Sequence, residues 1–357
     1  MIDTKAKEFL KELLKTPGLP GYELPAQNVW KNYVKNFSDE VSTDNYYNGI
    51  AKLNGEGYPK IMLIAHMDQI GLMVNYIDDN GFIYLKTLGY NYPASLLTRE
   101  VSIMTLKHGD IPGIITFPEE LYNKDEGNKL TLNKLFVDIG ASSPEEVKEK
   151  VRVGDYVAIK SNPFEIGNNC LVSPGLDDRT GCFAIAEVLR ELSDKEFKPC
   201  VFAVTSVQEE VNSLGAKLKS EELKPDIAII VDIELASDYP GTDKTKKPDI
   251  EMRKGPVISR GLCNNRFISH RLMEIAEEHS IPYQLYPDNT SNNTDLFTVV
   301  KTGALACVIT IPTRYYHTPV EMVDYVDIEN TVKLITEFIL SFNKSPEMWE
   351  EYCNKSV

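Results

Sequence analysis

Short apolar runs without polar alternation recur along the chain. Lys60–His66 reads KIMLIAH and Cys200–Ser206 reads CVFAVTS, and similar runs occupy 226–232 and 305–311. Runs of this kind are typical of central strands that are buried on both faces of a sheet. The pattern therefore predicts a sheet with several fully covered strands.

Segments with helical periodicity lie between these runs. The first, at 3–15, places apolar side chains on one face: Ala6, Phe9, Leu10, Leu13 and Leu14. Further helices are predicted near 24–36, 179–193, 213–220, 265–279 and 328–342. Alternating strands and helices indicate an α/β fold of three layers, with a mixed, mostly parallel sheet between helices.

The pattern changes between 70 and 164. Short segments interrupted by Gly, Asn and Asp predict successive strands and turns there. These segments are 71–77, 81–88, 100–107 and 111–116. Only 143–150 looks helical, with Pro144 near its first position. We therefore predict a small β-rich domain at 70–164, inserted into a larger domain formed by 1–69 and 165–357.

Composition narrows the possible partners and the compartment. The 357 residues suit two domains, and the formal net charge of −15 argues against nucleic acid and anionic membrane surfaces. No stretch approaches the roughly 18 apolar residues that a spanning helix needs. The six cysteines include no Cys-x-x-Cys, and the first residues lack the apolar core of a signal peptide. We expect free thiols in a reducing compartment and a cytoplasmic protein.

Histidines and carboxylates stand at or just after the ends of the predicted strands. They are His66, Asp68, Glu209, Glu210, Asp232 and His317, with Asp177 and Asp178 in a turn before the helix near 179. Ligands of open α/β sheets bind at the carboxyl ends of strands, so these side chains are expected to converge. Imidazole with carboxylate suits zinc, cobalt or manganese, and two such ions can clamp the oxygens of a hydrolysis. The spacing alone leaves the number of ions open.

Taken singly, several of these residues also have a simpler structural interpretation. Asp177 and Asp178 could cap a helix, and Glu209 and Glu210 could be a solvated pair. Together, the positions favour a metal site in which one glutamate binds metal and the other moves protons. Asp68 lies two residues after His66 and is therefore expected to hydrogen-bond the far nitrogen of its ring.

Five motifs in order resemble the M42 family of metallo-aminopeptidases. They are AHMDQIGLMV (65–74), LDDRTGC (176–182), VQEEV (207–211), VDIELASDYPG (231–241) and RYYHTPVEMVDYVD (314–327). The resemblance implies a two-metal aminopeptidase that removes N-terminal residues from short peptides, with zinc or cobalt as the ions. It also implies that the larger domain is catalytic, and that the inserted domain is PDZ-like and mediates dimerisation, up to a dodecamer.

The resemblance also implies a role for each residue. His66 and His317 are terminal ligands of different ions, Asp177 bridges the ions, and the Asp177–Asp178 peptide is cis. The remaining assignments are Glu210 and Asp232 as further ligands, Glu209 as general base and Asp68 as support for His66.

The substrate path is less well defined by the sequence. Thr294, Asp295 and Arg314 are candidate residues along it, and a capped loop and a surface ion pair are their structural alternatives. Three departures from the family pattern concern substrate preference. They are Gln69 for Glu, Asn212 for Gly, and Asn292–Asn293 for Gly-Gly.

Two other functions remain open at this point. Paired carboxylates also serve glycoside hydrolases, although these have no use for His66 and His317. A metal-binding assembly protein with a decayed site is the second alternative, and the presence of every proposed ligand argues against it.

Overall fold

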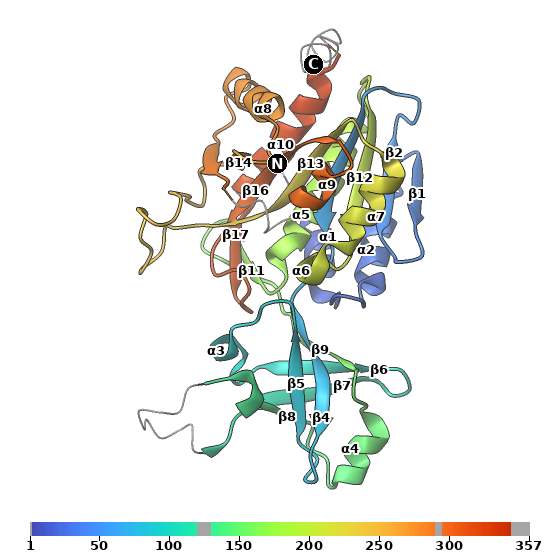
Figure 1. Cartoon of the computed structure of the whole chain (residues 1–357), viewed down its shortest axis with the longest axis vertical. Coiled ribbons are helices and arrows are strands. Elements are labelled where there is room, and N and C mark those ends of the chain that lie inside the picture. The colour runs from blue at the N-terminus through green and yellow to red at the C-terminus, as the bar shows by residue number, and fades with distance from the viewer. Residues whose placement is uncertain (1, 120–129, 290–294, 344–357) are drawn as a thin grey trace.

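An eight-stranded sheet forms the centre of the larger domain (Figure 1). The structure is a computed structural model that describes residues 2–119, 130–289 and 295–343. Four of the seven neighbouring pairs are parallel, so the sheet is mixed and mostly parallel, as predicted. Across the sheet the strands are β1 (Glu40–Thr43), β2 (Gly49–Leu53), β12 (Cys200–Ser206), β3 (Lys60–His66), β13 (Ile227–Leu235), β16 (Leu305–Thr313), β14 (Val257–Arg260) and β15 (Gln284–Pro287).

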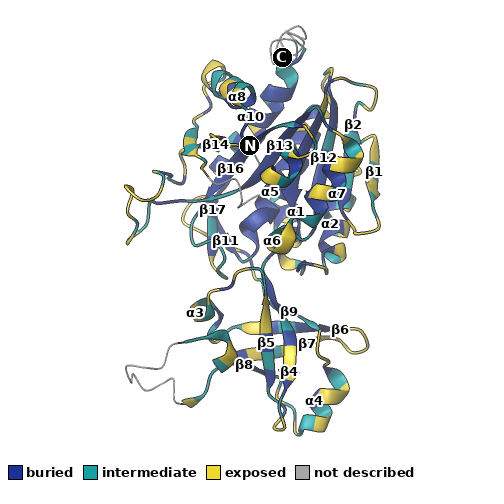
Figure 2. Ribbon diagram, viewed as in Figure 1, coloured by how far each residue is buried: buried dark blue, intermediate teal, exposed yellow. Residues whose placement is uncertain are grey.

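Helices cover both faces of this sheet, and the dark blue strands in Figure 2 show the resulting burial. Along β3, Ile61 and Leu63 pack into one hydrophobic core, whereas Met62 and Ile64 pack into another on the opposite face. Burying each such side chain contributes about 1.5–3 kcal/mol. The helices of the first face are α1 (Thr4–Lys15), α2 (Leu24–Val34), α5 (Leu176–Leu192), α8 (Arg266–Glu278) and α10 (Tyr325–Ser341). Those of the second are α7 (Leu214–Leu223) and α9 (Leu296–Val300), so the three-layer prediction is confirmed.

The inserted segment folds as a closed barrel of six antiparallel strands in the lower part of Figure 1. It has its own core, which includes Leu72, Ile83, Val101 and Val157. In order around the barrel the strands are β4 (Gly71–Ile77), β5 (Ile83–Leu88), β8 (Phe136–Asp138), β7 (Gly109–Thr116), β6 (Glu100–Thr105) and β9 (Tyr156–Ile159). The predicted β-rich insertion is confirmed, and its boundaries at 70 and 164 stay a prediction.

One helix of the inserted segment was predicted, and the described part of this segment contains two further single turns. Helix α4 (Pro144–Lys150) begins after Ser143, whose hydroxyl accepts a hydrogen bond from the Glu146 N–H. Helix α3 (Pro93–Leu96) and the 3₁₀ helix η2 (Leu132–Lys134) were not predicted. They are too short to show a helical period in the sequence.

A small third sheet joins distant parts of the chain beside the large one. Its strands are β10 (Phe164–Ile166), β11 (Cys170–Ser173) and β17 (Glu321–Asp324). Ser173 pairs with Glu321, which brings Glu321 next to the turn that carries Asp177. These strands have three or four residues each and were not predicted.

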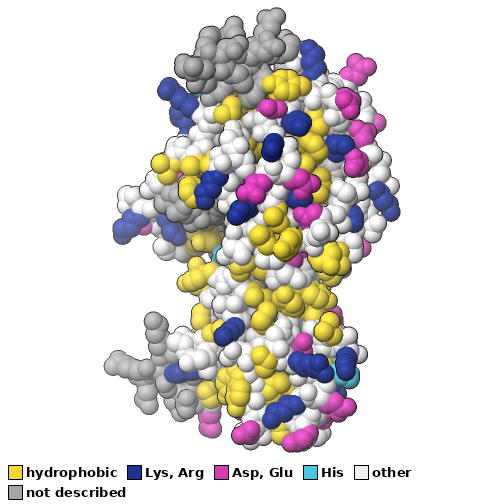
Figure 3. All heavy atoms as spheres, turned by 45° about the vertical axis from the view of Figure 1, so that its right-hand side comes forward, with side chains coloured by type: hydrophobic (Ala, Val, Ile, Leu, Met, Phe, Trp, Pro, Cys, Tyr) yellow, Lys and Arg dark blue, Asp and Glu magenta, His cyan; other side chains and the backbone are white. Residues whose placement is uncertain are grey.

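Charged side chains of both signs are interspersed on the face shown in Figure 3. Hydrophobic side chains gather on this face near the junction of the two domains. Within the described ranges, no helix is both long enough and apolar enough to span a bilayer.

Candidate active site

Parallel strands bring the predicted site residues to one edge of the large sheet. His66 is the last residue of β3, and its partner in register, Ser206, is the last residue of β12. Glu209 and Glu210 follow β12 in the single-turn helix α6 (Glu209–Asn212). Because β3, β12 and β13 are parallel, their carboxyl ends lie side by side.

Asp232 and His317 approach this edge from β13 and from the loop after β16. β13 continues to Leu235, so Asp232 lies inside the strand and not, as was predicted, at its end. Within the strand, Asp232 pairs in register with Thr310 of β16. His317 has a φ of 58°, a left-handed conformation that costs energy for a residue other than glycine. The surrounding contacts must therefore hold the His317 backbone in place.

Asp177 lies between the two histidines. Its Oδ1 is 3.2 Å from His66 Nε2, and its Oδ2 is 3.3 Å from His317 Nε2. The Asp177–Asp178 peptide is cis, as the resemblance implied. Burial alone would raise the pKa of Asp177, but hydrogen bonds from His317 and His66 outweigh it and hold this pKa below its usual value. A carboxylate with one oxygen beside each imidazole has the position expected of a bridge.

Further carboxylates surround these three side chains. His66 Nε2 is 3.9 Å from Glu209 Oε2 and 4.0 Å from Asp232 Oδ1, and His317 Nε2 is 3.5 Å from Glu210 Oε2. The structure therefore brings all five predicted ligands and Glu209 together. Among the residues that the structure describes, two sets of three side chains have donor atoms within 4.8 Å of one another: His66 with Asp177 and Glu210, and His66 with Asp178 and Asp232.

Asp178 is the neighbour that the sequence left as an alternative to Asp177. Its Oδ2 accepts a hydrogen bond from the His66 N–H (3.3 Å), and its Oδ1 accepts one from the Gly181 N–H (3.0 Å). Because both of its oxygens accept backbone hydrogen bonds, Asp178 is less suited than Asp177 to bind two ions.

The cluster has the donors and the charge that divalent cations require. Burial, together with neighbouring carboxylates, raises the pKa values of Glu209, Glu210 and Asp232 well above their usual range. Among the described side chains, Glu210 Oε1 and His317 Nδ1 are buried without a hydrogen-bond partner. Crowded anionic groups of this kind are stabilised by bound cations, and mixed imidazole and carboxylate donors suit zinc, cobalt or manganese. The residues present therefore fit a metal centre.

Asp68 connects β3 to the turn that carries the two glutamates. Its Oδ1 accepts a hydrogen bond from the Glu209 N–H (3.0 Å), and its Oδ2 accepts one from the Glu210 N–H (3.1 Å). The His66 Nδ1 lies 2.9 Å from the carbonyl oxygen of Asp68 and 3.7 Å from its carboxylate. The main chain thus makes the contact expected of the carboxylate, and the carboxylate instead orients Glu209 and Glu210.

Glu321 is a positioning residue that the sequence did not identify, although it lies in a quoted motif. It is buried, and it accepts hydrogen bonds from the His317 N–H at Oε1 (2.8 Å) and from the Asp177 N–H at Oε2 (3.2 Å). It therefore holds the backbone of two proposed ligands. Only its position in the third sheet reveals this role.

Glu321→Gln is expected to lower zinc affinity by about 10- to 100-fold. One of the two accepting oxygens becomes an amide NH₂ group, which cannot accept the hydrogen bond of the backbone N–H that it faces. Competition with a chromogenic chelator measures the affinity. Unchanged affinity would show that Glu321 does not position the ligands.

Glu23 links the N-terminal segment to the same turn. It is buried, and its Oε1 accepts hydrogen bonds from Gly21 N–H (2.8 Å) and Gln208 N–H (3.2 Å). Burial and the nearby charge of Asp68 raise the pKa of Glu23 from 4.5 to about 7. The folded state therefore keeps a proton that the unfolded chain has released, and stability falls as the pH rises through this window.

Glu23→Gln is expected to raise the free energy of unfolding by about 1–3 kcal/mol at pH 8 and to change it little at pH 5. The amide oxygen can still accept both backbone hydrogen bonds. Urea unfolding at the two pH values measures the difference. An equal effect at both would contradict the assigned pKa.

The three candidate residues of the substrate path have different surroundings. Thr294 lies outside the described residues. Asp295 is buried, with its Oδ2 accepting a hydrogen bond from the Ser206 hydroxyl (2.9 Å), and it is absent from the described lining of the cavity beside the cluster. Arg314 forms a two-point ion pair with Asp238, with both N–O distances 2.7 Å.

A cavity of about 800 Å³ opens beside the cluster. His66, Asp177 and Glu209 line one part of it, and Tyr90 and Tyr92 line another. Both tyrosines belong to the inserted segment, between β5 and α3. The inserted segment therefore contributes directly to the wall of the candidate active site.

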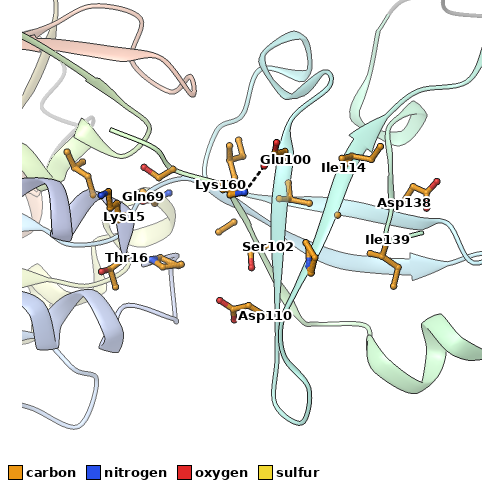
Figure 4. Close-up of a pocket in the computed structure, with 18 of the residues that line it drawn as sticks. Lys15, Thr16, Gln69, Glu100, Ser102, Asp110, Ile114, Asp138, Ile139 and Lys160 are labelled. Carbon is orange, nitrogen blue, oxygen red and sulfur yellow. Dashed lines mark hydrogen bonds and ion pairs between the residues drawn. The ribbon is translucent and has the colours of Figure 1, made fainter. Parts of the chain in front are cut away.

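A second cavity, of about 660 Å³, lies between the end of α1 and the barrel (Figure 4). Lys15, Thr16 and Gln69 face barrel residues there, among which Lys160 and Glu100 form an ion pair of 2.8 Å. None of the proposed metal ligands is in its described lining. It is therefore separate from the candidate active site.

Comparison with known proteins agrees with this geometry. A profile of the family described as M42 glutamyl aminopeptidase matches residues 48–334. Lysyl aminopeptidase of Pyrococcus furiosus is 34% identical, over 92% of this chain and 94% of that protein. The structure of a TET aminopeptidase from the marine sediment archaeon Thaumarchaeota archaeon SCGC AB-539-E09 has a TM-score of 0.88 and 30% identity, covering 94% of this chain and 96% of that one.

The Pyrococcus horikoshii TET1 peptidase, which can assemble into a tetrahedron or a large octahedral shell, has a TM-score of 0.84 and 29% identity. That match covers 94% of this chain and 99% of the other. The matches span both domains and the whole cluster of proposed ligands. The chain therefore belongs to the M42 glutamyl aminopeptidase family, and it is a metallo-aminopeptidase that hydrolyses peptide bonds.

Proposed function

We propose that the chain binds two divalent ions, zinc or cobalt, and removes N-terminal residues from short peptides. The position of Asp177 between two imidazoles carries this proposal, with Oδ1 3.2 Å from His66 Nε2 and Oδ2 3.3 Å from His317 Nε2. In this assignment His66 and His317 belong to different ions, and Asp177 belongs to both. Glu210 and Asp232 complete the ligand set.

Two ions held in this way would polarise the scissile carbonyl, lower the pKa of the attacking water and bind the free α-amine of the substrate. Glu209 is the proposed general base. It lies on the cavity wall, with its Oε2 3.9 Å from His66 Nε2, where a carboxylate that binds no metal could take the proton of the attacking water. The proton taken from water would then pass from Glu209 to the leaving amine.

In this proposal Asp68 orients Glu209 and Glu210. Its two oxygens accept the backbone N–H groups of Glu209 and Glu210, so a single carboxylate fixes both glutamates. One side chain can then bind metal while its neighbour faces the substrate. This arrangement keeps the base next to the ligands without making it one of them.

Assembly into a homo-oligomer, from a dimer up to a dodecamer, is part of the same proposal. It is supported by the Pyrococcus horikoshii relative, which can assemble into a tetrahedron or a large octahedral shell. The names of the relatives differ in the residue removed, since the family is described as glutamyl aminopeptidase and the Pyrococcus furiosus relative is a lysyl aminopeptidase.

The direct test is hydrolysis of aminoacyl p-nitroanilides by chelator-treated protein, before and after zinc or cobalt is restored. We expect the chelator to abolish hydrolysis and either metal to recover most of it, because the proposed reaction needs the ions to activate the carbonyl and the water. Cellulose is the control substrate for the glycosidase alternative. Chelator-resistant hydrolysis of cellulose, with no peptidase activity at any metal loading, would contradict the proposal.

A further inference from the structure

The end of the active-site cavity remote from the histidines crosses four neighbouring strands, β13, β16, β14 and β15. Glu234 follows Asp232 by two residues in β13, so both side chains lie on the same side of the strand. Ser259 pairs with Tyr286 between β14 and β15, and Asp288 follows two residues later. Glu234, Ser259, Tyr286 and Asp288 all line the cavity. The cavity therefore extends from the metal cluster across the sheet towards Asp288.

This remote end carries negative charge that bound metals would not neutralise. Two divalent ions would offset the carboxylates of the ligand cluster, but Glu234 and Asp288 are not among the proposed ligands. The described lining of the cavity includes no lysine or arginine.

A buried hydroxyl on the same wall provides independent evidence of a ligand. Thr310 pairs in register with Asp232, lines the cavity and is only 2% exposed. Among the described side chains, its Oγ1 is one of the few buried polar atoms without a hydrogen-bond partner. An unsatisfied buried hydroxyl costs free energy unless something else binds it. A polar group of a substrate entering the cavity would meet that requirement.

We propose that this end of the cavity holds the side chain of the N-terminal residue, and that Glu234 and Asp288 select a basic side chain, lysine or arginine. The inference rests on the proposed aminopeptidase function, because it assigns a substrate class to the same site. The aliphatic part of the side chain would pack along Val308 and Phe297, which also line the cavity. Its cationic end would lie near the two carboxylates.

The test compares kcat/KM for p-nitroanilides of lysine, norleucine and glutamate with metal-loaded protein. Norleucine has the same straight aliphatic chain as lysine but no ammonium group, so the lysine-to-norleucine ratio isolates the charge. We expect a ratio of roughly 10 to 100 and very low activity with glutamate. The variants Glu234→Gln and Asp288→Asn should each reduce the ratio several-fold.

The lysine-to-norleucine ratio does not change when a variant loses activity on all substrates equally. If Glu234→Gln disturbs the metal centre, Asp288→Asn still tests whether the carboxylates select a basic side chain. Asp79→Asn removes one negative charge from an exposed turn of the barrel and should leave the ratio unchanged. A ratio near 1 with good norleucine hydrolysis, or a preference for glutamate, would overturn this inference while the peptidase proposal stands. No hydrolysis of any substrate after metal restoration would overturn both.

Discussion

Glu209→Gln is expected to lower kcat for aminoacyl p-nitroanilide hydrolysis by about 100- to 10,000-fold while both metal ions stay bound. The amide has nearly the same shape as the carboxylate but cannot take a proton from water. Since Glu209 is the proposed base and not a ligand, KM and metal content should change little. Steady-state kinetics and elemental analysis of the same sample measure both quantities.

Glu210→Gln is the matched control, because it makes the same chemical change at the adjacent residue of α6. Glu210 Oε2 lies 3.5 Å from His317 Nε2, and Glu210 is a proposed ligand. Its variant should therefore lose metal affinity, and excess zinc should recover part of its activity. If Glu209→Gln lost metal while Glu210→Gln kept it, the two roles would have been assigned in the wrong order.

Asp177→Asn is expected to abolish activity and to reduce bound zinc from two ions per chain to fewer than one. An amide has no negative charge and presents only one oxygen, so it cannot serve the two sites that the Asp177 carboxylate faces. Asp177 Oδ1 and Oδ2 lie within 3.3 Å of different imidazoles, which is why both ions should be affected. Inductively coupled plasma mass spectrometry of dialysed protein gives the stoichiometry.

Asp178→Asn is the control for that result. Asp178 accepts hydrogen bonds from the His66 and Gly181 N–H groups, so its loss should mainly destabilise the fold. We expect it to lower the free energy of unfolding by about 1–3 kcal/mol and to retain two ions. Loss of metal from Asp178→Asn but not from Asp177→Asn would identify Asp178 as the bridge.

The central strands and the convergence of the site could be predicted because their signals are local. Strands β3 and β12 have the predicted bounds, since an apolar run buried on both faces has clear limits. Parallel pairing then placed His66, Glu209 and Asp232 at one edge. The residues alone left the choice between Asp177 and Asp178 open, and the family resemblance supplied the choice of bridge and base.

Other features depend on contacts that no local pattern records. No local pattern indicated that Glu321 would contact Asp177 and His317, because strand β17 has four residues and its partner β11 is distant in the chain. The two-residue spacing of His66 and Asp68 predicted proximity but not which oxygen would face the ring. Because the predicted strand ended at Asp232, Glu234 was not considered as a site residue. The observed strand β13 is longer and places Glu234 on the wall of the cavity.

Titration of the metal-free protein with zinc, monitored by isothermal calorimetry and by activity, measures how many ions the chain binds and how many it needs. We expect two ions per chain, full activity only after the second binds, and the loss of one ion in each of His66→Ala and His317→Ala. These variants separate the two sites because each imidazole belongs to a different ion in the proposed assignment. Full peptidase activity with one ion per chain, or loss of the same single ion in both variants, would contradict a two-metal centre bridged by Asp177.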